Sequence, residues 1–124
     1  MTSIIVAGSR DFTDKDFLSG KLDELISGID GDIEIVSGHC RGADMLGEQY
    51  AKEHKIAMRV FIANWDEYGR AAGYIRNRHM AEYAAENNGI LAAFPIGESR
   101  GTMLMVKLAK QYGLKCNVFY APKE

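Results

Sequence analysis

Apolar and β-branched residues of this chain gather in short runs, and longer segments with a helical period separate those runs. The short runs predict strands at 3–7, 33–37, 57–62, 90–94 and 116–120. Alternation of this kind is typical of a parallel sheet whose strands are joined by crossover helices. We therefore expect an α/β fold with a small, mainly parallel sheet of about five strands.

Four segments between the runs place apolar residues three or four positions apart, on one face of a helix. They predict helices over 14–28, over 43–54, from about Ala72 to Asn87-Asn88-Gly89, and from about Gly101 to Tyr112. Right-handed crossovers place such helices on both faces of the sheet. The expected architecture is a single three-layer, Rossmann-like domain over 1–124.

The composition narrows the class of protein. Hydrophobic residues make up 47% and charged residues 26%, which is ordinary for a folded protein. A net charge of -2 gives no overall basic field, so we do not expect nucleic acid as a partner. Two cysteines fit neither a disulfide framework nor a zinc site, and no run approaches the ~20 apolar residues of a membrane span. We expect a cytoplasmic protein without a membrane segment, a cofactor or a metal.

Three glycine-rich turns follow predicted strands. They are Gly8-Ser9-Arg10, Ser37-Gly38-His39-Cys40-Arg41-Gly42-Ala43-Asp44 and Gly97-Glu98-Ser99-Arg100-Gly101-Thr102. Glycine lets a ligand approach the main chain, and unpaired amides at the start of a helix favour phosphate. Ligands of such sheets bind at the carboxyl ends of the strands, where all three turns lie. The turns together predict phosphate recognition.

Other nucleotide and hydrolase motifs are absent from the sequence. Gly8 does not begin a Gly-x-Gly-x-x-Gly run, which argues against ordinary NAD binding. The chain has neither the Walker A spacing nor a Gly-x-Ser-x-Gly elbow, which argues against a nucleoside triphosphatase and an α/β-hydrolase. The expected phosphate site is therefore of another kind.

The candidate ligand contacts come from the turns and from the segment after the third strand. Phosphate would be held, and the pocket closed, by Ser37, Gly38, Arg41, Gly42, Arg100, Gly101, Thr102, Gly8, Ser9 and Arg10. Asp44 could accept hydrogen bonds from ribose hydroxyls, and Arg76 and Asn77 would contact the remainder of the ligand. Trp65 either stacks on a base or packs its loop onto the body, and His39 could contact the ligand or donate a proton.

Five stretches of the chain can be compared with known proteins. They are Gly8-Ser9-Arg10, Ser37-Gly38-x-x-Arg41-Gly42-Ala43-Asp44, Asn64-Trp65-Asp66-x-Tyr68-Gly69, Ala72-Gly73-x-Ile75-Arg76-Asn77-Arg78-x-Met80, and Phe94-Pro95 before Arg100-Gly101-Thr102. In combination they resemble the YspA-type branch of the SLOG superfamily, the group that includes DNA-processing protein A and the Lonely guy enzymes. The resemblance implies a Rossmann-like fold that binds nucleotides or nucleotide-derived ligands, often as a homodimer. Met80 and Tyr83 could supply the dimer interface or pack in the core.

The Lonely guy enzymes cleave the N-glycosidic bond of a nucleoside monophosphate with an arginine and a glutamate. The segment Arg76-Asn77-x-x-Met80 is similar to their Arg-Lys-x-x-Met, so the resemblance implies a catalytic role for Arg76. The position of their glutamate holds Met105 here, although Glu98 could supply a carboxylate from the loop. Our first hypothesis is binding or sensing of a nucleotide or nucleotide-derived molecule. The alternative is a phosphoribohydrolase-like N-glycosidase.

Overall fold

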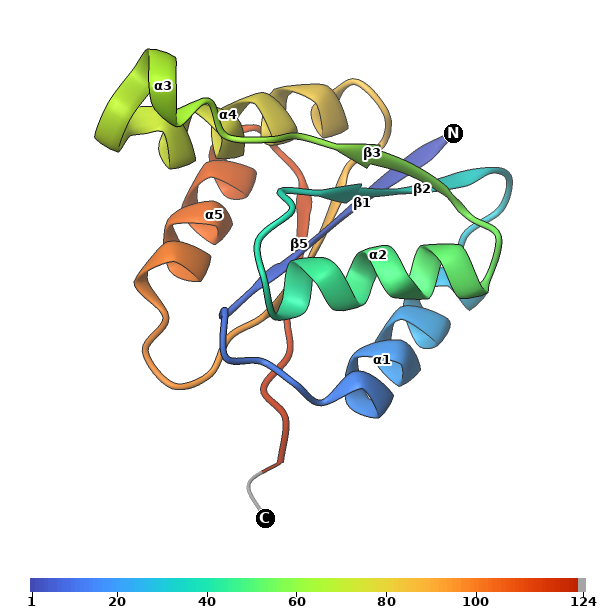
Figure 1. Ribbon diagram of the computed structural model, residues 1–124. Helices are drawn as coiled ribbons and strands as arrows, with labels where there is room; N and C mark the ends of the chain where they lie inside the picture. The colour runs from blue at the N-terminus through green and yellow to red at the C-terminus, as the bar shows by residue number, and fades with distance from the viewer. Residues whose placement is uncertain (123–124) are drawn as a thin grey trace.

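A five-stranded, fully parallel sheet forms the centre of the computed structural model, which describes residues 1–122 (Figure 1). Its strands are β1 (Thr2–Gly8), β2 (Ile33–Ser37), β3 (Ala57–Val60), β4 (Ile90–Phe94) and β5 (Lys115–Val118). Their spatial order is β3-β2-β1-β4-β5, with every neighbouring pair parallel. The α/β fold and the parallel sheet are therefore confirmed. Residues 123–124 of the predicted domain lie outside the described residues.

Helices cover both faces of this sheet. They are α1 (Lys15–Ser27), α2 (Ala43–Glu53), α3 (Trp65–Tyr68), the 3₁₀ turn η1 (Gly69–Ala71), α4 (Ala72–Ala85) and α5 (Arg100–Gln111). Figure 1 shows α1 and α2 on one face and α4 and α5 on the other. Within residues 1–122, no helix is long and apolar enough to cross a membrane.

Two apolar clusters join the sheet to its helices. Ile4 and Val6 of β1 point to the cluster with α1 and α2, whereas Ile5 points to the cluster with α4 and α5. A central strand that is buried on both faces has a continuous run of apolar residues. The position of β1 could therefore be predicted from the sequence. Because all five strands are parallel, their carboxyl ends lie at the same edge of the sheet.

Met80 and Tyr83 belong to the packed side of α4. Met80 is 2% exposed in the cluster under α4 and α5. The Tyr83 hydroxyl donates to Oε2 of the buried Glu34 at 2.5 Å, and Ser3 Oγ donates to the same oxygen at 2.7 Å. The structure thus shows packing in the core for Met80, whereas Tyr83 is partly buried and packs against the same cluster. The homodimer implied by the resemblance stays a prediction.

The segment after β3 differs from the expected loop. Here α3 and η1 precede α4, and the Asn64 side chain begins α3 by accepting from the Glu67 amide at 3.1 Å. Asn64 Nδ2 also donates to the Glu67 carboxylate at 3.1 Å, which joins the two side chains across the first turn. The outer strands β3 and β5 are also shorter than predicted, because each has a neighbour on one side alone.

Candidate functional site

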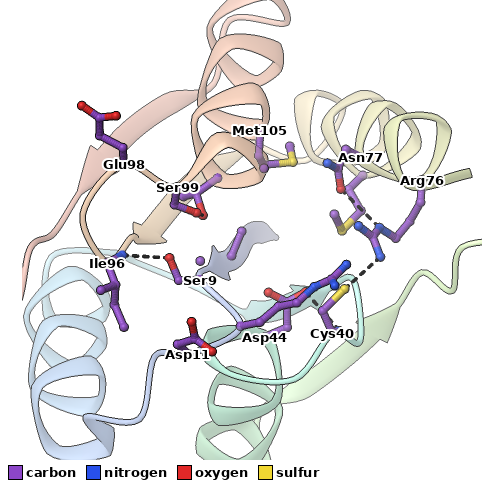
Figure 2. A pocket seen from close by; sticks show the side chains of 16 residues that line it. Ser9, Asp11, Cys40, Asp44, Arg76, Asn77, Ile96, Glu98, Ser99 and Met105 are labelled. Carbon is purple, nitrogen blue, oxygen red and sulfur yellow. Dashed lines mark hydrogen bonds between the residues drawn. The ribbon is translucent and has the colours of Figure 1, made fainter. Parts of the chain in front are cut away.

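The first cleft lies at the carboxyl ends of β1 and β4, the point where the strand order reverses, and has a volume of about 450 Å³. Such a point is where ligands of open α/β sheets bind. Four segments line the cleft: the end of β1 with the turn after it, the β2–α2 loop, α4, and the loop into α5 (Figure 2). The lining residues are Ala7, Gly8, Ser9, Arg10, Asp11, Cys40, Asp44, Arg76, Asn77, Met80, Ile96, Glu98, Ser99, Gly101, Thr102 and Met105.

Close contacts between main chains hold these loops around the cleft. A Cβ on Gly8 would lie 2.3 Å from the Phe94 carbonyl oxygen, and a Cβ on Gly42 would lie 2.3 Å from the Ser9 carbonyl oxygen. Gly42 also has a φ of +82°, which side chains rarely adopt. The Ile96 amide donates to Ser9 Oγ at 2.8 Å and ties the loop after β4 to the turn after β1. Gly8 and Gly42 therefore allow the main chains of these loops to come into contact, which a side chain at either position would prevent.

The N-terminus of α5 forms one wall. Ser99 Oγ and Thr102 Oγ1 lie 2.7 Å apart, and the Ser99 side chain makes no capping bond to the helix. Gly101 and Thr102 line the cleft, so the first amides of this 12-residue helix are placed beside it. Unpaired amides and the helix dipole favour an anion at such a position.

Arg76 of α4 closes the opposite wall. Its Nη1 donates to the Gly38 carbonyl oxygen at 3.0 Å and to Cys40 Sγ at 3.2 Å, and its Nε donates to Asn77 Oδ1 at 3.2 Å. These bonds hold the guanidinium between α4 and the β2–α2 loop. A fixed positive charge therefore faces the cleft.

Asp44 is the buried carboxyl group of the cleft, with 6% of its surface exposed. Burial raises the pKa of Asp44 from 3.8 to about 6. The Cys40 amide, which donates to Oδ2 at 3.3 Å, and the Arg76 guanidinium lower the same pKa, while the Glu48 carboxylate raises it. Asp44 can therefore accept a hydrogen bond when ionised, or carry a proton close to neutral pH.

A second cleft of about 440 Å³ lies beside the first. Its lining consists of Arg10, Gly38, His39, Cys40, Arg41, Ile62, Ala63, Trp65 and Arg76, of which Arg10, Cys40 and Arg76 also line the first cleft. Trp65 is 56% exposed here, so its ring has a free face. The structure thus divides the predicted ligand contacts between two adjoining clefts.

Three predicted contacts line neither cleft. Ser37 is fully buried, and its hydroxyl donates to Glu48 Oε2 at 2.8 Å instead of facing a cleft, so its contact with phosphate stays a prediction. Gly42 packs against the turn after β1, and Arg100 is exposed at the start of α5. Glu98 borders the first cleft, but Figure 2 shows its carboxylate directed away from the centre.

Several lining residues escaped the sequence interpretation. Asp11, Ile96 and Ser99 lie in or beside the predicted turns, so their positions in the sequence could have indicated that they line the cleft. The contact between His39 and Glu48 joins a loop to a helix face and had no such signal. Among residues 1–122, no three His, Cys, Asp or Glu side chains are grouped to hold a metal ion. The absence of a metal stays a prediction.

Comparisons with known proteins agree with the motif resemblance. A model of the YspA, cpYpsA-related SLOG family matches residues 2–68, which is a little over half of the chain. The Gene 61 protein of Mycobacterium phage D29 is 26% identical over 119 residues, which cover 92% of this chain and 93% of the phage protein.

A solved structure extends the likeness to the fold. DNA processing protein A (DprA) from Streptococcus pneumoniae superposes with a TM-score of 0.65 and 18% identity, over 99% of this chain and 50% of that one. The chain thus spans half the length of the DprA chain that it matches, and this likeness concerns the fold. The resemblance read from the motifs is confirmed, and the chain belongs to the YspA, cpYpsA-related SLOG family.

Proposed function

We propose that this protein binds a nucleotide or a nucleotide-derived small molecule in the first cleft. The observation that carries the proposal is the pairing of a helix N-terminus, at Gly101 and Thr102, with the guanidinium of Arg76 across a cleft at the strand-order reversal. This pairing suits an anion, and about 450 Å³ falls within the usual range of small-molecule pockets. Membership of the SLOG family also suggests a nucleotide-related function.

Each wall has a role in this proposal. The amides of Gly101 and Thr102 bind the phosphate, and the Ser9 hydroxyl donates to it. Arg76 donates a charge-assisted hydrogen bond to the phosphate, and such bonds are stronger than those between neutral groups. Asp44 accepts from the ribose hydroxyls, since an ionised carboxylate is an acceptor alone.

Calorimetric titration with nucleoside monophosphates and diphosphates tests the proposal. Arg76→Ala should lose about tenfold or more in affinity, the loss expected when a hydrogen bond to a charged group is removed. Arg78→Ala is the matched control, because Arg78 lies on the same helix, pairs with Glu82 at 3.5 Å and lines neither cleft. Equal affinities for Arg76→Ala and the wild type would remove this residue from the site.

An N-glycosidase is the second candidate, and the position of Asp44 favours it. A Cβ on Gly38 would lie 3.0 Å from Asp44 Oδ2 and 3.1 Å from Arg76 Nε, so a carboxyl group and a guanidinium face each other across this glycine. Met105 occupies the position where related enzymes carry their glutamate, and Glu98 points away. Asp44 is therefore better placed than Glu98 to stabilise a positive centre on the sugar.

Incubation with a nucleoside monophosphate distinguishes the two candidates. An enzyme would release free base and ribose 5-phosphate as water replaces the base, and Asp44→Asn would abolish that release. Recovery of the intact nucleotide from a protein that binds it would exclude the enzyme and leave the binding function standing. Chromatography of the mixture provides the measurement.

A further inference from the structure

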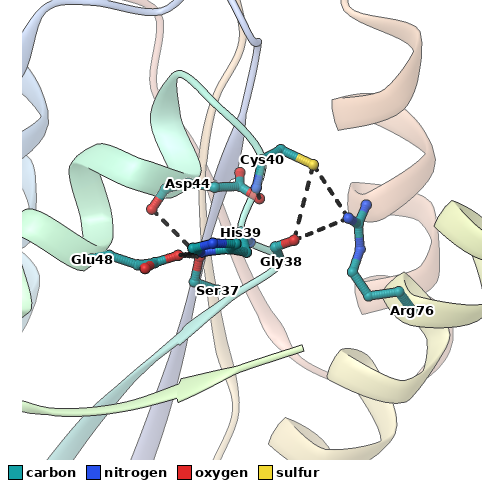
Figure 3. A network of polar contacts seen from close by, with 7 residues as sticks. All are labelled: Ser37, Gly38, His39, Cys40, Asp44, Glu48 and Arg76. Atoms are coloured by element: carbon teal, nitrogen blue, oxygen red, sulfur yellow. Dashed lines mark hydrogen bonds and ion pairs between the residues drawn. The ribbon is translucent and has the colours of Figure 1, made fainter. Parts of the chain in front are cut away.

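A buried carboxylate holds the imidazole of His39. Glu48 is 3% exposed, and its Oε2 lies 2.8 Å from His39 Nδ1 and accepts from Ser37 Oγ at 2.8 Å (Figure 3). The His39 amide in turn donates to Ser37 Oγ at 3.0 Å. Three polar contacts therefore close a ring around one histidine.

The main chain at His39 is in an uncommon conformation. Its φ is +62°, in the left-handed region that favours glycine and asparagine. Such a conformation costs free energy and persists where its surroundings impose it, as at ligand-binding sites. A glycine here would relieve the strain but would leave the buried Glu48 without its imidazole partner.

The contact with Glu48 determines which ring nitrogen is free. A carboxylate only accepts, so the proton between the two groups belongs to Nδ1 of His39. Nε2 of this tautomer carries no hydrogen, so it can accept a hydrogen bond from another partner. The side chain is 46% exposed and lines the second cleft, together with Arg41 and Trp65.

We propose that the second cleft is a subsite in which His39, positioned by Glu48, contacts the part of the ligand beyond its first phosphate. This inference rests on the proposed function of the first cleft. Arg10, Cys40 and Arg76 border both clefts, so one ligand can extend from one to the other.

The lining identifies the chemical class of that ligand. Arg10 and Arg41 suit a second phosphate, Nε2 of His39 suits a sugar hydroxyl that donates to it, and the free face of Trp65 suits a sugar or base attached to that phosphate. The ligand is thus a nucleoside diphosphate that carries a further group.

Calorimetry with AMP, ADP and ADP-ribose tests this subsite. The wild type should bind ADP-ribose more tightly than AMP. His39→Asn keeps a residue that tolerates the left-handed turn and should weaken ADP-ribose binding by up to about tenfold, the effect of one lost neutral hydrogen bond, with a much smaller effect on AMP. His79→Asn, at an exposed position of α4 outside both clefts, is the matched control.

Glu48→Gln tests the positioning. The imidazole ¹⁵N shifts of His39 should report a proton on Nδ1 in the wild type and a changed tautomer balance in the variant, together with weaker ADP-ribose binding. A purely structural Glu48 would lower the melting temperature and leave both readouts unchanged, which would overturn its role. Equal affinity of the wild type for AMP and ADP-ribose would overturn the subsite but leave the proposed function. Absence of binding by all three probes would overturn both.

Discussion

Asp44 combines two opposing demands at the scale of a single residue. Its place in the first cleft makes it the carboxyl group available to a ligand, and the same place removes it from water. Burial raises the pKa of Asp44 to about 6, so the free protein is destabilised when the group is ionised at neutral pH. A ligand that donates hydrogen bonds to the carboxylate would offset this cost.

The pH dependence of stability follows from this shift. Because the pKa is higher in the folded state, the folded protein retains a proton that the unfolded chain has lost between pH 3.8 and about 6. The contribution of Asp44 to stability is therefore fully present below pH 3.8 and is lost as the pH rises through 6.

Asp44→Asn should accordingly raise the free energy of unfolding at pH 7 by up to roughly 3 kcal/mol, which corresponds to a shift of about two pKa units. The gain should shrink as the pH falls through 6 and vanish below 3.8. Urea unfolding of both proteins across this range provides the measurement. Asp16→Asn, at an exposed position of α1, controls for the lost charge. A gain that is the same at every pH would contradict the account of Asp44.

At the scale of elements, α3 and the β2–α2 loop show where sequence interpretation stops. Helix α3 has four residues, which is too few to show a helical period of apolar positions. Its one signal in the sequence is the N-terminal cap formed by Asn64 and Glu67, whereas each of the long helices has a continuous apolar face. The sequence placed Ser37 correctly at the end of β2, but its hydroxyl turns inward to Glu48, eleven positions later. Side-chain partners across elements are not encoded in local spacing.

The cap of α3 leads to a local prediction. None of the residues of α3 is buried, so Asn64→Ala should loosen this helix at a cost of about 1 kcal/mol without a comparable loss of global stability. Hydrogen exchange should accelerate at the amides of Glu67 and Tyr68, which donate to Asn64, and remain unchanged in β1 and β4. A matching loss of protection in the central strands would show that α3 supports the whole fold.

At the scale of the whole molecule, the strand order creates the site. Strands β2 and β3 lie on one side of β1, and β4 and β5 lie on the other. The loops that follow β1 and β4 therefore turn to opposite faces of the sheet and leave a space between them at the carboxyl ends of these strands. The protein carries a net charge of -2, yet Arg10 and Arg76 meet at this opening. Asp11, Asp44 and Glu98 line the first cleft beside these arginines, whereas the second cleft adds Arg41 and is lined by no carboxyl group. Positive charge is thus concentrated in the second cleft.

Amide NMR titration with AMP reports both whether AMP binds to the protein and where it binds. We expect the largest shift changes at Ser9, Gly101 and Thr102, around the first cleft, and no change at the distant turn at Gly113. Spectra that stay unchanged at millimolar AMP, or shift changes confined to surfaces away from the first cleft, would contradict this expectation.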